Sequence, residues 1–156
     1  MNITTNSPEE TVLLAEVFAS CISAGELILF FGDLGAGKTT FTKGFAKALG
    51  IADGVHSPTF TLIHEHEGAK KLYHIDLYRL ETQEEIDGLG LEEYLVPDAI
   101  TLIEWSERFR ELPENHIIVK IETTGETRRS FTFSSDHLDD PFFEAMKKEY
   151  QKRCIF

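Results

Sequence analysis

The segment Gly32–Thr39 holds the residues of this chain whose types and spacing are best suited to chemistry. It fits the pattern G-x-x-x-x-G-K-[ST], in which glycines let successive backbone N–H groups turn toward a polyphosphate. The Lys38 ammonium would reach the β- and γ-phosphates, and the Thr39 hydroxyl would ligate Mg²⁺. A helix that begins inside the loop adds the positive end of its dipole. The pattern therefore predicts a phosphate-binding loop.

The flanking sequence has the order that such a loop requires. Leu27–Phe31 is an unbroken apolar run, which is typical of a buried parallel strand. After the loop, Phe41, Phe45 and Leu49 recur at helical spacing, and Gly50 ends the run. This strand–loop–helix context favours a ligand site over the alternative, a glycine-rich turn that binds nothing.

Two carboxylates are candidates for completing the site. A phosphate loop needs a second group that organises the metal, usually an acid at the end of a neighbouring apolar strand. Asp76 closes the run 72–75, and Glu104 closes the run 99–103. Mg²⁺ prefers oxygen ligands and keeps several waters, so one acid can ligate directly and the other through water. A structural role stays open for both, because strand-end acids often face solvent and Asp76 could instead bond Arg79 or cap a turn.

The segment between the helix and the next predicted strand holds further polar candidates. Ser57 and Thr59 flank a proline where P-loop proteins often place a switch that senses the γ-phosphate, although a turn hydrogen bond is the alternative. His64 and His66 share one face of a predicted strand. Since no Cys or acid completes a tetrahedral set at metal-site spacing, we predict a solvated face there rather than a metal pair.

Length and composition set bounds on the class of protein. The chain has 156 residues, 42% hydrophobic and 27% charged, which suits one globular domain over residues 1–156. No apolar run approaches the roughly 18 residues of a membrane span, and the N-terminus lacks the features of a signal peptide. Cys21 and Cys154 lie near opposite ends and are expected to be reduced. These features predict a cytoplasmic protein without a membrane segment.

The formal net charge of −12 argues against a protein that grips DNA or RNA backbones by itself. The acidic residues gather in one stretch with little local positive charge: Glu81, Glu84, Glu85, Asp87, Glu92 and Glu93. Such a run is commonly a solvated helix face. It can also be a docking surface for a basic partner, and both interpretations stay open.

Periodicity and turn residues predict the elements that position these side chains. Ser7-Pro8-Glu9-Glu10 predicts a helix start, and apolar spacing carries that helix to Gly25. The other predicted elements are a hairpin of 60–66 with 72–77, a helical stretch 82–95 with candidate breaks at Gly88 and Gly90, a buried strand 99–103, a hairpin of 117–122 with 130–133, and a helix 141–150. This order indicates a small α/β sandwich with a mixed parallel and antiparallel sheet.

Four motifs resemble those of the bacterial TsaE family and occur in the family's order. They are Gly32–Thr40, Ser57–Thr61, His74–Arg79 and Ile103–Glu107. The resemblance implies a P-loop NTPase-like three-layer sandwich that binds ATP or ADP with Mg²⁺ and hydrolyses ATP. It also implies a role in threonylcarbamoyladenosine (t⁶A) modification of tRNA together with TsaD and TsaB, with tRNA met only through that complex.

The same resemblance implies roles residue by residue. Lys38, Asp76 and Glu104 would be catalytic, and Thr39, Asp76 and Glu104 would surround the metal. Ser57 to Thr59 would form a switch-like segment. The nucleotide would contact Asp33, Leu34, Gly35, Ala36, Gly37, Lys38, Thr39 and Thr40, together with Thr11 and Arg129.

Two other functions use the same loop. One is a small-molecule kinase, which needs an acceptor pocket and usually an arginine-bearing lid. The chain's few arginines form no compact lid segment in the sequence. The other is a nucleotide-dependent interaction switch with negligible turnover. Phosphate release separates an ATPase from a switch, and a phosphorylated product would identify a kinase.

Overall fold

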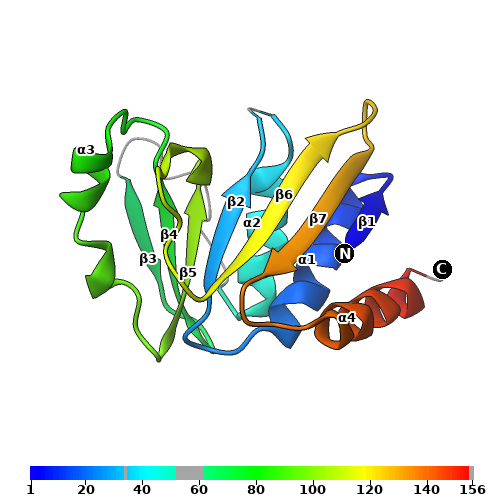
Figure 1. Ribbon diagram of the computed structural model, residues 1–156. Coiled ribbons are helices and arrows are strands. Elements are labelled where there is room, and N and C mark those ends of the chain that lie inside the picture. Colours follow the sequence, from blue (N-terminus) through cyan, green and yellow to red (C-terminus); the bar gives the residue numbers. More distant parts are fainter. Residues whose placement is uncertain (34, 52–61, 155–156) are drawn as a thin grey trace.

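A computed structural model describes residues 1–33, 35–51 and 62–154 of the chain (Figure 1). The strands are β1 (Asn2–Thr5), β2 (Leu27–Phe31), β3 (Ile63–His66), β4 (Lys71–Asp76), β5 (Ala99–Glu104), β6 (His116–Thr123) and β7 (Arg129–Ser135). The helices are α1 (Pro8–Cys21), α2 (Lys38–Ala48), α3 (Gln83–Asp87) and α4 (Asp140–Arg153), with 3₁₀ turns at Leu91–Glu93 and Ser106–Arg108.

The strands form one mixed sheet in the order β1-β7-β6-β2-β5-β4-β3. Strands β4, β5, β2 and β6 run parallel, and the three outer strands pair antiparallel with their neighbours. Because the carboxyl ends of parallel strands meet at one edge, this topology gathers the ends of β2, β4 and β5. The register sets Asp76 directly beside Glu104. The predicted α/β class with a mixed sheet is confirmed.

Helices α1 and α2 cover one face of the sheet, behind the strands in Figure 1, and α4 packs against α1. Aromatic rings fill this layer: the centroid of Phe18 lies 5.2 Å from that of Phe133, and the centroid of Phe41 lies 5.2 Å from that of Phe30. All four side chains are fully buried. Dense packing of this kind resists displacement of α2, whose first residue is Lys38.

The opposite face carries a smaller apolar cluster that includes Leu29, Ile75, Ile86 and Ile103. Short elements cover it, namely α3 and the two 3₁₀ turns, with Trp105 and other partly buried side chains packed against it. The chain therefore forms three layers, of which the third is thin. Alternation along each strand explains the division, since Ile75 and Ile103 point to one face and their neighbours Asp76 and Glu104 to the other.

The predicted start of the first helix is confirmed, because the Ser7 hydroxyl accepts a hydrogen bond from Glu10 N. The Glu10 carboxylate accepts from Asn6 N at 2.7 Å, one residue before the cap. The helix ends at Cys21, earlier than the predicted Gly25. The predicted buried strands, the second hairpin and the C-terminal helix are all present, with bounds shifted by a residue or a few.

Strand β1 is an element that the sequence analysis did not predict. It has four residues and pairs antiparallel with β7, Ile3 lying opposite Phe131. A four-residue edge strand shows too little alternation to be recognised. Its pairing also joins the two ends of the chain, and local sequence carries no signal for such a contact.

The stretch 82–95 is broken at its glycines, as predicted: α3 ends at Asp87, and Gly90 has φ 66° before the next turn. Helix α3 begins with a capping box. The Thr82 hydroxyl accepts from Glu85 N, and a Glu85 carboxylate oxygen accepts from Glu81 N at 2.9 Å. Glu85 therefore has a local structural role.

The prediction of a solvated face for His64 and His66 is wrong. Both are half-buried, and Glu65 between them is the exposed residue of the strand. His64 pairs in register with His74, which is 1% exposed, so the histidines lie on the helix-covered face. Within the described residues, no group of three His, Cys, Asp or Glu side chains could hold a metal ion.

The two cysteines form no disulfide with each other: Cys21 and Cys154 are free and half-buried. In the described ranges, no helix combines the length and the apolarity that crossing a bilayer would need. Ser57, Thr59 and Leu34 lie outside the described residues.

The close contact between α1 and α2 generates a prediction. A Cβ on Gly44 would lie 2.7 Å from the Val12 carbonyl oxygen, which is backbone and cannot rotate away. Alanine would ordinarily raise helix propensity by about 1 kcal/mol. We expect Gly44→Ala instead to lower the free energy of unfolding by about 1–3 kcal/mol, because separating two packed helices costs more. Denaturant unfolding measures this. The control Lys43→Ala, at an exposed site of the same helix, should change stability little; a stabilised Gly44→Ala protein would contradict the contact.

Candidate functional site

The loop Gly32–Thr39 joins the carboxyl end of β2 to the first turn of α2. Gly37 is the N-cap residue of α2 and has φ 105°, a left-handed conformation that a side chain would strain. No side chain among the described residues caps this end of the helix. The N–H groups of the first turn are consequently available to an anion rather than satisfied by the protein.

Lys38 is the buried cation of the loop. Its ammonium donates a hydrogen bond to the Gly32 carbonyl oxygen at 2.8 Å and lies 3.8 Å from the centroid of the Trp105 ring. The residue is only 7% exposed. A lysine ammonium is rarely buried unless it is paired, so its surroundings must supply compensating charge.

Carboxylates supply that charge. Burial lowers the pKa of the Lys38 ammonium below its ordinary value of 10.5, while Glu104, Glu107, Asp76 and Asp33 act in the opposite direction. Desolvation is the larger effect, so the pKa is lowered on balance. Four carboxylates thus act on this one ammonium, which leaves negative charge near Lys38 for a second cation.

Asp76 and Glu104 form the deepest part of this arrangement. They end the adjacent parallel strands β4 and β5 side by side and are 1% and 2% exposed. An Asp76 carboxylate oxygen accepts from Tyr78 N at 2.8 Å, which fixes the turn after β4. A Glu104 carboxylate oxygen lies 3.5 Å from His74 Nε2. Both acids therefore face the loop instead of solvent.

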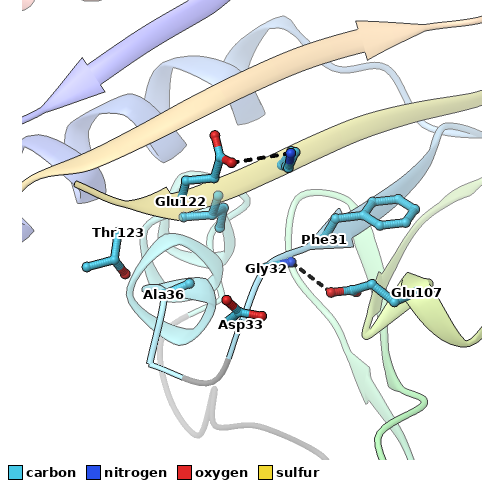
Figure 2. A pocket seen from close by; sticks show the side chains of 9 residues that line it. Phe31, Gly32, Asp33, Ala36, Glu107, Glu122 and Thr123 are labelled. Atoms are coloured by element: carbon cyan, nitrogen blue, oxygen red, sulfur yellow. Dashed lines mark hydrogen bonds and ion pairs between the residues drawn. The ribbon is translucent and has the colours of Figure 1, made fainter.

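Glu107 is a site residue to which the sequence analysis assigned no role. Its carboxylate accepts a hydrogen bond from Gly32 N at 3.1 Å, which ties the start of the loop to the segment after β5. Figure 2 shows this bond at one wall of a cleft of about 400 Å³, with Glu122 and Thr123 at the opposite wall and Ala36 and Asp33 between them. The cleft gives open space directly beside the Gly32–Thr39 loop.

Thr11 and Arg129, which the resemblance placed near a nucleotide, do lie beside the loop. Together with Gly37 and Thr40 they line a small pocket of about 90 Å³. The Arg129 guanidinium donates to the Ala36 carbonyl oxygen at 3.0 Å and to the Gly125 carbonyl oxygen at 3.1 Å. The Thr11 hydroxyl is 2.8 Å from the Thr5 hydroxyl and is buried. Arg129 therefore braces the loop from the β6–β7 side.

An aromatic and cationic cluster lies on the other side of Lys38. The rings of Trp105 and Tyr78 are 4.9 Å apart, and the Arg108 guanidinium lies 5.9 Å from each ring. Tyr78 is 44% exposed. Its position gives the loop one solvent-facing aromatic wall.

The donors present fit Mg²⁺. The hydroxyl of Thr39 and the carboxylates of Asp76 and Glu104 are all oxygen ligands, which this ion prefers. Mg²⁺ usually takes only one or two protein carboxylates and keeps water or phosphate oxygens in its other positions.

The structure brings together most of the predicted site residues. Lys38, Asp76 and Glu104 converge on one point, and Asp33, Gly35, Ala36, Gly37, Thr39 and Thr40 surround it in the loop. The contributions of Glu107 and of the Trp105 ring were missed. Glu107 stands three residues after Glu104, and spacing alone does not show that the turn directs it back to Gly32.

Comparison with known proteins identifies relatives. The model of the family described as threonylcarbamoyl adenosine biosynthesis protein TsaE matches residues 5–131. The Bacillus subtilis protein named tRNA threonylcarbamoyladenosine biosynthesis protein TsaE is 44% identical over 133 residues, covering 84% of this chain and 83% of that protein. The Treponema pallidum protein of the same name is 35% identical, covering 85% and 98%. The crystal structure of Bacillus subtilis YdiB matches with a TM-score of 0.77 at 36% identity, over 98% of this chain and 95% of that one.

The contact between Lys38 and the only tryptophan can be measured. As pH rises through the lowered pKa of Lys38, the ammonium over the Trp105 ring loses its charge, and the indole emission should change. We expect a transition in Trp105 fluorescence with a midpoint below 10.5. Lys38→Met is the control, because it keeps bulk and removes the charge; subtracting its titration removes the contribution of tyrosine ionisation. A midpoint at or above 10.5 in the difference curve would show that Lys38 is not desolvated.

Proposed function

The chain belongs to the TsaE family, and on that premise we propose that it binds ATP or ADP with Mg²⁺ at the Gly32–Thr39 loop and hydrolyses ATP. We further propose that this activity serves t⁶A modification of tRNA, with TsaD- and TsaB-like proteins as partners. The name shared by its relatives supports the pathway. The observation that carries the ATPase proposal is the convergence of the buried Lys38 ammonium with two buried strand-end carboxylates.

The Lys38 ammonium could replace its present hydrogen bond with a bond to a phosphate oxygen. It donates to the Gly32 carbonyl oxygen, a neutral acceptor. A phosphate oxygen is anionic and would make a stronger, charge-assisted bond. Its position over Trp105 and beside Glu104 supports the proposal that the terminal phosphates bind at that end of the loop, where the lysine would stabilise charge that develops during phosphoryl transfer.

Thr39, Asp76 and Glu104 would hold the metal, directly or through water. Mg²⁺, when bound, neutralises charge on the β- and γ-phosphates. The two carboxylates face the loop from parallel neighbouring strands, so they are preorganised and need no rearrangement when a metal arrives. His74, at 3.5 Å from Glu104, helps to set the position of that carboxylate.

The net charge of −12 supports dependence on a partner. Such a charge repels a free anionic nucleotide everywhere except at the loop. We propose that the chain alone is a slow ATPase and that a partner complex changes turnover by completing the site. Phosphate release with and without TsaD and TsaB distinguishes this from a nucleotide switch, which would show binding without turnover in both conditions.

The first test removes the loop cation. We expect Lys38→Ala to lower ATP affinity or turnover at least about a hundredfold, because it deletes the positive charge at the β- and γ-phosphates. Binding can be followed by Trp105 emission and turnover by phosphate release. The exposed control Lys43→Ala should behave as wild type. A folded Lys38→Ala protein that hydrolyses ATP normally would remove the basis of the proposal.

The second test separates the two acids by titrating Mg²⁺. We expect Asp76→Asn and Glu104→Gln each to reduce Mg²⁺-dependent hydrolysis by an order of magnitude or more, while weak nucleotide binding persists. Both substitutions keep shape and remove charge, so they test metal organisation rather than packing. Wild-type Mg²⁺ dependence in Asp76→Asn would mean that Asp76 only fixes the turn at Tyr78 and that Glu104 acts alone.

A further inference from the structure

A groove of about 230 Å³ opens on the thin outer layer, between α3, the turn at Leu91–Glu93 and the segment 109–113. Its lining includes the apolar residues Ile86, Leu95 and Phe109, which we call the floor, and the acids Asp87, Glu92 and Glu111, which we call the rim. A hydrogen bond from Arg110 N to the Gln83 side chain joins the two walls at 3.0 Å. We call this feature the α3 groove.

The floor exposes apolar surface that the protein does not cover. Leu95 is 40% exposed and is one of two large apolar side chains with such exposure in the described part of the chain. Ile86 beneath it is 1% exposed and belongs to the outer-layer core. A single exposed leucine is unremarkable on an open surface. Here it lies at a concave site of definite shape, where a ligand side chain could be fully desolvated.

The lining of the groove is acidic: among its described residues it holds Asp87, Glu92 and Glu111 and no lysine, arginine or histidine. The nearest bases in the sequence are Arg108 and the exposed Arg110, so the acids outnumber the bases at this site. The Arg108 guanidinium is engaged elsewhere, donating to the Tyr78 carbonyl oxygen at 3.1 Å. An acidic rim around an apolar floor attracts positively charged ligands and repels nucleotides and nucleic acids.

We propose that the α3 groove anchors a basic, amphipathic segment of a partner protein, which places an apolar side chain against Leu95 and Phe109 and lysine or arginine at the rim. The groove is too small to be a whole interface, but it suits the central anchor of one. This inference rests on the proposed function, because the partner we expect there is the TsaD–TsaB pair.

The location gives such a partner access to the nucleotide site. The segment that carries Glu104, Trp105 and Glu107 continues directly into Phe109 and Glu111 of the groove. A partner segment seated on Phe109 therefore contacts the same stretch of chain that ties Gly32 and covers Lys38. Docking and the geometry of the loop would be linked through this one segment.

Association and dissociation rates of the TsaD–TsaB pair with the full chain test the proposal at several salt concentrations. We expect Leu95→Ser to speed dissociation about tenfold at every salt concentration, because it removes an apolar anchor. Glu92→Lys should slow association about fivefold at low salt, and the difference should fade as salt rises. The matched control is Glu144→Lys, an equal charge change on α4, which lies at the other end of the molecule from α3 (Figure 1). It should leave both rates within about twofold of wild type.

Glu92 is chosen in preference to Glu85, whose reversal would also break the capping box of α3. Thermal unfolding checks that each variant is folded, and Trp105 emission checks that each binds Mg²⁺-nucleotide. If the wild-type protein does not bind Mg²⁺-nucleotide, the proposed function itself is wrong. If wild type binds nucleotide but does not bind the pair, or if Leu95→Ser and Glu92→Lys bind the pair with wild-type rates, the α3 groove is not the docking site.

Discussion

The arrangement of this molecule depends on one constraint, the burial of the Lys38 ammonium at the carboxyl edge of the sheet. A buried cation is costly unless anions and hydrogen-bond acceptors surround it. The parallel strands β4 and β5 bring Asp76 and Glu104 to that point in register, the turn after β5 adds Glu107, and the Gly32 carbonyl oxygen accepts the hydrogen bond. Four carboxylates act on the ammonium, so removing one of them weakens its compensation, whereas removing the lysine leaves all four without their shared cation. The residues of the site therefore also contribute to the fold.

The hydrophobic layers hold Lys38 in its buried position. The loop can hold Lys38 in place only because α2 cannot shift, and α2 is fixed by aromatic packing on one side and by the close approach of Gly44 to Val12 on the other. The outer layer is thin, and Trp105, which packs against it, connects Lys38 to a surface that a partner can reach. Stability is concentrated behind the sheet, and the residues that would exchange partners are concentrated at its edge.

The sequence predicted the features that depend on neighbouring residues, and it missed those that depend on contacts between residues far apart in the chain. The glycine pattern, the apolar run of β2 and the strand-end positions of Asp76 and Glu104 are local signals, and the structure brings these residues together. Strand β1 forms by pairing with β7, more than 100 residues later in the chain, and its four residues show no periodicity that would predict a strand. The histidines of β3 are half-buried because the sheet sets His64 opposite His74 on the helix-covered face, a register that cannot be read from one strand.

The backbone conformation of Trp105 makes several contacts of the site possible at once. Its φ of 59° lies in the left-handed region, which costs a bulky residue roughly 1–2 kcal/mol. That conformation ends β5 abruptly and reverses the chain. The indole then covers Lys38 and packs on Tyr78, the Glu107 carboxylate reaches Gly32, and Phe109 continues into the outer layer. The cation–π contact and the charge-assisted hydrogen bond offset the strain, because each contributes about as much as the strain costs. A regular continuation of the strand would carry Glu107 away from the loop and separate the outer layer from the site. The unfavourable dihedral angle is thus the structural link between the Gly32–Thr39 loop and the surface beside it.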